Sequence, residues 1–160
     1  MSYAKKAIER LNLIDWHQTL GTGHEKDMEL GIEFMKKLFA FCKKNKIRPR
    51  YPTYPFMTDL SSFFADIEID DEIWNQCNHD IRDRIETPSF STVILSHYIK
   101  AAILADQDPQ YAACMDVYDP IIRLFEKGGD FYYRERGMSF QGSGLIPLTT
   151  DFVERIMSQV

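Results

Sequence analysis

The stretch Phe90-Ser-Thr-Val-Ile-Leu-Ser-His-Tyr-Ile-Lys-Ala-Ala-Ile-Leu104 decides the fold of this chain. A helix drawn through it carries apolar residues on almost every side, among them Val93, Ile94, Ile99 and Ile103. A helix with this distribution is surrounded by other elements rather than lying on a surface. We therefore predict that residues 90–104 form the central helix of a helical domain.

On the N-terminal side of this stretch, apolar spacing predicts further helices. Thr22 and Glu25 have the spacing of a capping box, so a helix begins there, and it ends before Pro49. Asp70 is placed to cap another helix that continues to Thr87. The apolar stripe of that helix consists of Ile73, Cys77, Ile81 and Ile85. Helices are also expected over residues 2–16 and, as a short segment, around 60–67.

On the C-terminal side, two Asp-Pro pairs follow, Asp108-Pro109 and Asp119-Pro120. Each could be an N-cap before a proline at the first helical position, which leaves two short helices or one kinked helix as alternatives. Residues 130–144 alternate apolar and polar side chains around Gly137, which predicts a β-hairpin, and Asp151 follows at the start of a last helix. The expected fold is a mainly α, single-domain helical bundle over residues 1–160, with about six to eight helices and a small β-hairpin near the C-terminus.

The length and the cysteines limit the classes of protein to which this chain can belong. A chain of 160 residues with 44% hydrophobic content can bury one core and is too short for two domains. Cys42, Cys77 and Cys114 are odd in number and lie among apolar residues, which is typical of reduced core thiols. The opening residues form no apolar signal segment, and no apolar run reaches membrane-spanning length. We therefore expect a cytoplasmic protein that does not engage a membrane.

Charge is distributed unevenly along the chain. Residues 1–56 carry 11 Lys and Arg against 6 Asp and Glu, whereas residues 57–126 carry 4 against 14. An acidic patch attracts a basic partner and speeds encounter with it. The same charge repels phosphate, so we expect no direct binding of nucleic acid. The basic run from Lys43 to Arg50 is accordingly interpreted as a solvated helix end and a connector, with a nucleic-acid contact as the alternative.

No recognisable catalytic, metal or cofactor motif occurs. His17, His24, His79 and His97 lack the paired spacing of a zinc site, and the segment Gly142-Ser143-Gly144 lacks the Lys-Ser/Thr ending of a phosphate loop. We expect no cofactor, no metal and no enzymatic activity. A small enzyme that uses histidine and carboxylate residues stays open as an alternative; it would require two histidines to converge on a carboxylate in one pocket.

The acidic group is the more distinctive feature. Capping and the dipole of a helix N-terminus explain the presence of Asp70, Asp71 and Glu72 without any partner. The other carboxylates have no such local role. The alternative interpretation is a solvated face with no partner. As partner-binding residues we single out Asp66, Glu68, Asp71, Glu72, Asp80 and Asp83.

An acidic helical domain with Gly128-Gly-Asp-Phe131 opening a hairpin and Gly144-Leu-Ile-Pro-Leu148 near the end resembles bacterial immunity proteins of polymorphic toxin and contact-dependent growth-inhibition systems. The resemblance extends over the whole chain but includes no diagnostic motif, so it assigns no role to a particular residue. It implies a protein that binds and neutralises one cognate toxin domain, often a nuclease. A non-catalytic adaptor or regulatory binding protein has a similar composition, and the oligomeric state stays open.

Overall fold

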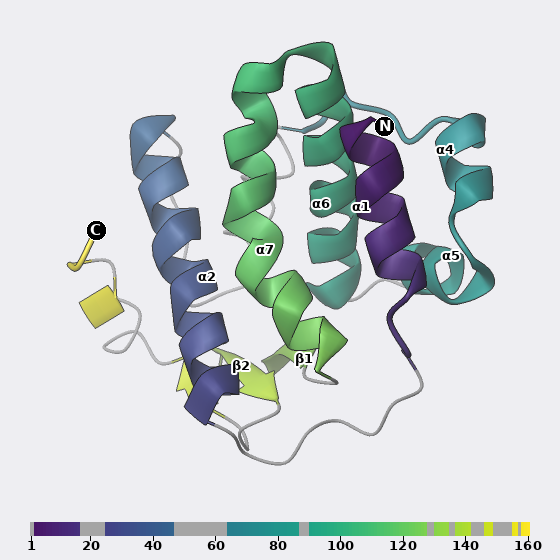
Figure 1. Ribbon diagram of the computed structural model, residues 1–160. Coiled ribbons are helices and arrows are strands. Elements are labelled where there is room, and N and C mark those ends of the chain that lie inside the picture. The colour runs from purple at the N-terminus through teal and green to yellow at the C-terminus, as the bar shows by residue number, and fades with distance from the viewer. Residues whose placement is uncertain are drawn as a thin grey trace.

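The central helix of the fold is α6 (Phe90–Gln107), which packs against α1 (Tyr3–Asn12) on one side and α7 (Ala112–Glu126) on the other (Figure 1). The computed structural model describes residues 2–16, 25–46, 64–86, 90–127, 130–134, 137–141, 146–148, 155–156 and 158–160. Within α6, Ile94, Leu95 and Ile99 are completely buried. The prediction of a central buried helix is confirmed.

The described residues are mainly helical, as predicted, and include six α-helices. Helix α2 (Glu25–Lys44) packs along α7, so that α2, α7, α6 and α1 lie side by side (Figure 1). The buried hydrophobic side chains of α2 are Leu30, Phe34, Met35, Leu38, Phe39 and Cys42. The start of this helix at Thr22 and the first half of the short helix expected around 60–67, residues 60–63, lie outside the described residues. Phe64, the first described residue of that segment, lies in a turn and is completely buried.

The first turn of helix α1 is held by hydrogen bonds to Ser2 and to Asp106. Ser2 Oγ accepts a hydrogen bond from the Lys5 backbone at 3.0 Å, which makes Ser2 the N-cap. The carboxylate of Asp106, at the end of α6, accepts from the backbone N–H groups of Tyr3 at 2.6 Å and of Ala4 at 3.0 Å. The first turn of α1 therefore takes its hydrogen-bond acceptors from two separate parts of the chain.

The two Asp-Pro pairs play different roles. Asp108 caps a single 3-10 turn, η1 (Pro109–Tyr111), by accepting from the Gln110 backbone. Asp119 caps nothing, because α7 continues through Pro120. Its carboxylate instead forms ion pairs with Arg10 at 2.7 Å and Arg123 at 2.9 Å. The region therefore forms the 3-10 turn η1 followed directly by one α-helix that contains Pro120, and not two short α-helices that each begin at an Asp-Pro pair.

The predicted single helix from Asp70 to Thr87 is wrong. Two short helices take its place, α4 (Asp71–Gln76) and α5 (His79–Glu86). Cys77 between them has an extended backbone with ψ 136°. The expected stripe still faces inward, since Cys77 and Ile81 are buried and Ile73 and Ile85 are half-buried.

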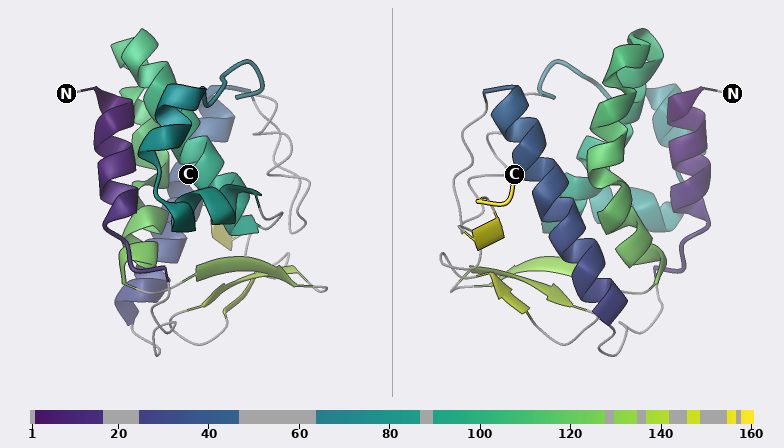
Figure 2. Two further views of the ribbon diagram at one scale, coloured as in Figure 1. Left: turned by 90° about the vertical axis from the view of Figure 1, so that its right-hand side faces the viewer. Right: turned by 60° about the vertical axis from the view of Figure 1, so that its left-hand side comes forward.

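The strands lie at one end of the helices (Figure 2). β1 (Asp130–Arg134) pairs antiparallel with β2 (Gly137–Gln141), and β2 pairs antiparallel with β3 (Ile146–Leu148). The register places Phe131 opposite Phe140. The segment expected to form a hairpin thus contributes to a sheet with strand order β1-β2-β3.

All three cysteines are free thiols and buried, as predicted. Within the described ranges, no helix has both the length and the apolar character needed to cross a bilayer.

Candidate partner-binding surface

All six carboxylates singled out from the sequence lie in one described segment, residues 64–86, which folds into a turn, α4 and α5. Five of them are exposed and Asp80 is half-buried. The left panel of Figure 2, turned toward this side of the molecule, shows α4 and α5 nearest the viewer. Helix α2, with its C-terminal lysines, lies at the opposite side of the molecule (Figure 1).

Helix α4 has a capped first turn and buries little of its surface in the core. Asp70 is its N-cap, as predicted, and its side chain accepts from the Ile73 backbone N–H at 2.9 Å. Asp71 and Glu72 follow in the first turn, where the helix dipole favours negative charge. The helix has no fully buried residue, and Ile73 and Trp74 are half-buried. Its outer side is therefore available to another molecule.

A pair of asparagines fixes the junction between α4 and α5 to the end of α1. Asn12 Nδ2 donates to the Gln76 carbonyl at 2.9 Å, and Asn12 Oδ1 accepts from the Asn78 backbone N–H at 2.9 Å. Asn78 Nδ2 in turn donates to the Asn12 carbonyl at 3.3 Å. Asn78 Oδ1 accepts from Ile81 N–H at 3.0 Å, so the same residue caps α5. These four hydrogen bonds, which we call the asparagine clasp, explain why the predicted single helix breaks here.

Helix α5 is anchored by one apolar and one cationic side chain. Ile81 is completely buried. Arg84 Nη2 donates to the Trp16 carbonyl at 3.0 Å, and its guanidinium carbon lies 4.6 Å from the centre of the Trp16 ring. Trp16 in turn contacts Phe125 of α7, with ring centroids 5.6 Å apart. The acidic segment is thus attached to the helical core at the junction between α4 and α5 and through α5.

Negative charge is in large excess on this surface. Residues 64–86 contain eight carboxylates and two arginines. Asp66, Glu68, Asp71 and Glu72 form no ion pair with any residue in the described part of the chain, whereas Asp80 and Asp83 take part in interactions within the chain. A surface of this kind attracts a positively charged partner.

Two contributors to this surface were not predicted. Trp74, which was not among the predicted contact residues, is half-buried and follows Asp71 and Glu72 on α4. A tryptophan beside charged residues is a common anchor in protein interfaces. The asparagine clasp was also missed, because its two residues are 66 positions apart and no local pattern connects them.

The described histidines lie in different environments. His97 is 3% exposed, and its Nδ1 lies 3.2 Å from the Tyr118 hydroxyl in the core, whereas His79 is exposed at the start of α5. His17 and His24 lie outside the described residues. No three His, Cys, Asp or Glu side chains among the residues that the structure describes are grouped so that they could hold a metal ion. In the basic run, Lys43, Lys44 and Lys46 are exposed, and its remainder lies outside the described part.

No protein-family model, curated protein or solved structure matches this chain.

Proposed function

We propose that this protein is a cytoplasmic immunity protein that binds a cognate toxin domain, a nuclease with a basic active-site cleft, and covers that cleft with an acidic surface. The contact is formed by Asp66, Glu68, Asp71, Glu72, Asp80 and Asp83. The observation that carries the proposal is the exposure of five of these six carboxylates on a segment that the asparagine clasp holds against α1.

A rigid acidic surface suits this task for two physical reasons. A nuclease cleft carries positive charge because it binds phosphates. The same positive potential attracts the carboxylates of an inhibitor that covers the cleft. A segment that is already held in place loses little conformational entropy on binding, which leaves more of the contact energy for affinity. Half-buried Trp74 adds an aromatic anchor among the carboxylates.

A non-catalytic adaptor with a basic partner is the second candidate, and the same surface supports it. The identity of the partner distinguishes an immunity protein from an adaptor. A toxin domain encoded next to this protein is expected to arrest growth when expressed alone and to be tolerated when both are expressed together. Absence of binding between the two purified proteins would overturn the immunity proposal.

The contribution of the acidic surface is tested by single charge reversals. D66K and E68K alter exposed residues outside helices that have no ion pair within the described part of the chain. Each is expected to leave melting unchanged and to slow association with the toxin about tenfold at low salt, with a smaller effect at high salt. The double variant D80K/D83K is expected to weaken binding as well.

E29K is the matched control, because its reversal changes net charge equally and Glu29 is exposed on α2. Helix α2 lies on the opposite side of the molecule from α4 and α5 (Figure 1). Its association rate is expected to stay within about twofold of the parent, since screening limits the reach of a distant exposed charge. If E29K and the acidic-surface variants slow association equally, the effect is one of net charge, and the proposed contact surface is wrong.

A further inference from the structure

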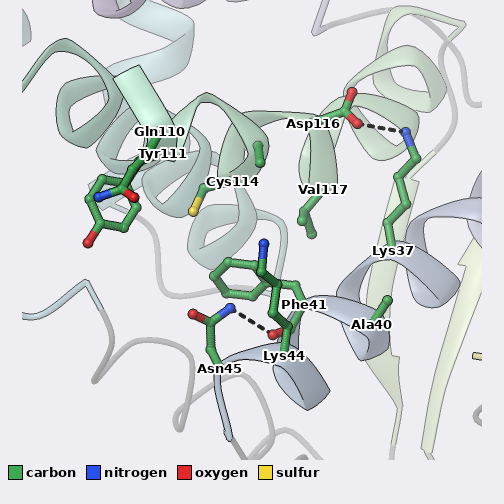
Figure 3. Close-up of a pocket in the computed structure, with 11 residues that line it drawn as sticks. Lys37, Ala40, Phe41, Lys44, Asn45, Gln110, Tyr111, Cys114, Asp116 and Val117 are labelled. Atoms are coloured by element: carbon green, nitrogen blue, oxygen red, sulfur yellow. Dashed lines mark hydrogen bonds and ion pairs between the residues drawn. The ribbon is translucent and has the colours of Figure 1, made fainter. Parts of the chain in front are cut away.

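A cavity of about 430 Å³ lies between the C-terminal half of α2 and the start of α7 (Figure 3). It is on the side of the molecule away from α4 and α5, so it is separate from the acidic surface (Figure 1). Its volume is within the range of pockets that hold small organic molecules. The lining residues come from α2, from η1 and from the first turns of α7.

The inner wall of the cavity is apolar. Phe41 of α2 faces Cys114 and Val117 of α7 across it (Figure 3). Cys114 is 3% exposed, and burial raises the pKa of its thiol, so the sulfur is protonated and behaves as an apolar surface. Two exposed alanines, Ala40 and Ala113, also line the cavity and keep it open, because neither has a side chain long enough to fill it.

The charges around the cavity do not cancel. Lys37 and Asp116 neutralise one another through an ion pair of 3.4 Å at one end. Lys44, the remaining charged residue of the lining, forms no ion pair with a residue in the described ranges. Figure 3 shows Lys44 and Phe41 together among the lining residues. The cavity therefore combines an apolar wall with one uncompensated positive charge.

Two amide side chains at the cavity are already positioned by bonds within the protein. Asn45 Nδ2 donates to the Phe41 carbonyl at 2.9 Å, and Gln110 Nε2 donates to Asp108 Oδ2 at 2.7 Å. These bonds orient the side chains before any ligand arrives, which reduces the entropy lost on binding.

A second cavity, beside Arg123, provides a contrast. It has a volume of about 480 Å³, but Leu30 is its one apolar lining residue. The other lining residues are Glu29, Glu33, Arg123, Glu126 and Lys127, and Arg123 pairs with Glu33 at 3.2 Å. An apolar ligand would gain little there.

We propose that the cavity between α2 and α7 binds an amphipathic organic anion, a small molecule with a compact apolar or aromatic body and one carboxylate. The body lies against Phe41, Cys114 and Val117, and the carboxylate pairs with the Lys44 ammonium. This site is independent of the proposed toxin contact, and binding at either can be lost without loss at the other.

The test uses 2-naphthoate and its uncharged counterpart, 2-naphthalenemethanol, titrated into the isotope-labelled full chain and followed by NMR. Naphthoate is expected to shift the backbone signals of Ala40, Ala113 and Val117 saturably and to bind about fivefold more tightly than the alcohol, because only the carboxylate pairs with an exposed lysine. K44Q is expected to remove this preference. K43Q, which removes the neighbouring exposed lysine outside the lining, is expected to keep it.

A113W provides a second variant that needs no change of charge. The indole is expected to fill the cavity from an exposed position, so folding is retained and saturable binding of both compounds is lost. The proposal is overturned if naphthoate shifts no signal of the cavity, if K44Q and K43Q behave alike, or if A113W binds as the parent does.

Discussion

His97 of α6 and Tyr118 of α7 are joined by a buried hydrogen bond of 3.2 Å between the imidazole Nδ1 and the phenolic oxygen. The Phe64 ring packs against both, with its centroid 5.0 Å from that of the imidazole. Burial, with a smaller effect from Lys100, lowers the pKa of His97 to about 3. The imidazole is therefore neutral in the folded protein at neutral pH, whereas in the unfolded chain it is protonated below about pH 6.5.

This difference predicts a loss of stability in acid. Because the folded pKa of His97 lies below the unfolded one, the unfolded chain binds the extra proton between about pH 6.5 and pH 3, and stability falls as pH falls through that window. Between pH 7 and pH 5 the free energy of unfolding is expected to fall by about 2 kcal/mol from this residue. Urea denaturation at both pH values measures it. H97Q should lose most of the dependence, and H79Q, at an exposed position, should retain it.

Replacement of Ile99 by Asp tests the central position of α6. Ile99 is completely buried, so the variant would place an unpaired carboxylate in the core and is expected to lose about 4 kcal/mol or more, enough to prevent folding. Circular dichroism and thermal melting measure the effect. Q107D, at the exposed end of the same helix, should stay within about 0.5 kcal/mol of the parent. A parental melting curve for I99D would contradict the central position of α6.

Removal of the asparagine clasp should loosen the acidic segment. N78A deletes the α5 cap and one bond to Asn12, and is expected to cost about 2 kcal/mol. Hydrogen exchange should then increase at the backbone amides of α4 and α5 more than at those of α6. N75A, which alters an exposed asparagine of α4, is the control and should change neither quantity.

The end of α2 offers a stabilising substitution. Lys46 has φ 57°, a left-handed conformation that is unfavourable for a residue with a Cβ atom. K46G is therefore expected to raise the free energy of unfolding by about 0.5 to 1 kcal/mol, despite the greater freedom of glycine in the unfolded chain. K43G, inside the helix, should instead lower it by about 1 kcal/mol. A decrease for both variants would show that position 46 gains nothing from glycine.

The parts of the fold that depend on local patterns could be predicted from the sequence. The apolar residues of α6, the N-caps Asp70 and Asp108 and the exposure of most of the acidic residues follow from spacing and charge within a few positions. The break at Cys77 could not be predicted, because the apolar stripe continues through it. The hydrogen bonds between Asn12 and the junction, together with the Asn78 cap of α5, favour two helices over one.

Asp119 shows the same limit. Its position before Pro120 is that of an N-cap, yet α7 continues through it and Arg10 of α1, 109 positions away in the chain, pairs with its carboxylate. The cavity between α2 and α7 likewise depends on residues such as Lys44 and Cys114, which come from different helices. Tertiary contacts of this kind leave no trace in a short window of sequence.

The two backbone bonds from α1 to Asp106 span more than a hundred residues of chain, with separations of 103 and 102 positions. A ten-residue helix is marginal in water by itself. During synthesis α1 is made long before Asp106. The two hydrogen bonds of its first turn to Asp106 can therefore form only after α6 has been made. Ribosome-bound chains that end before Asp106 should therefore keep this segment accessible to protease, and docking of α1 is a late step of folding although it comes early in the sequence.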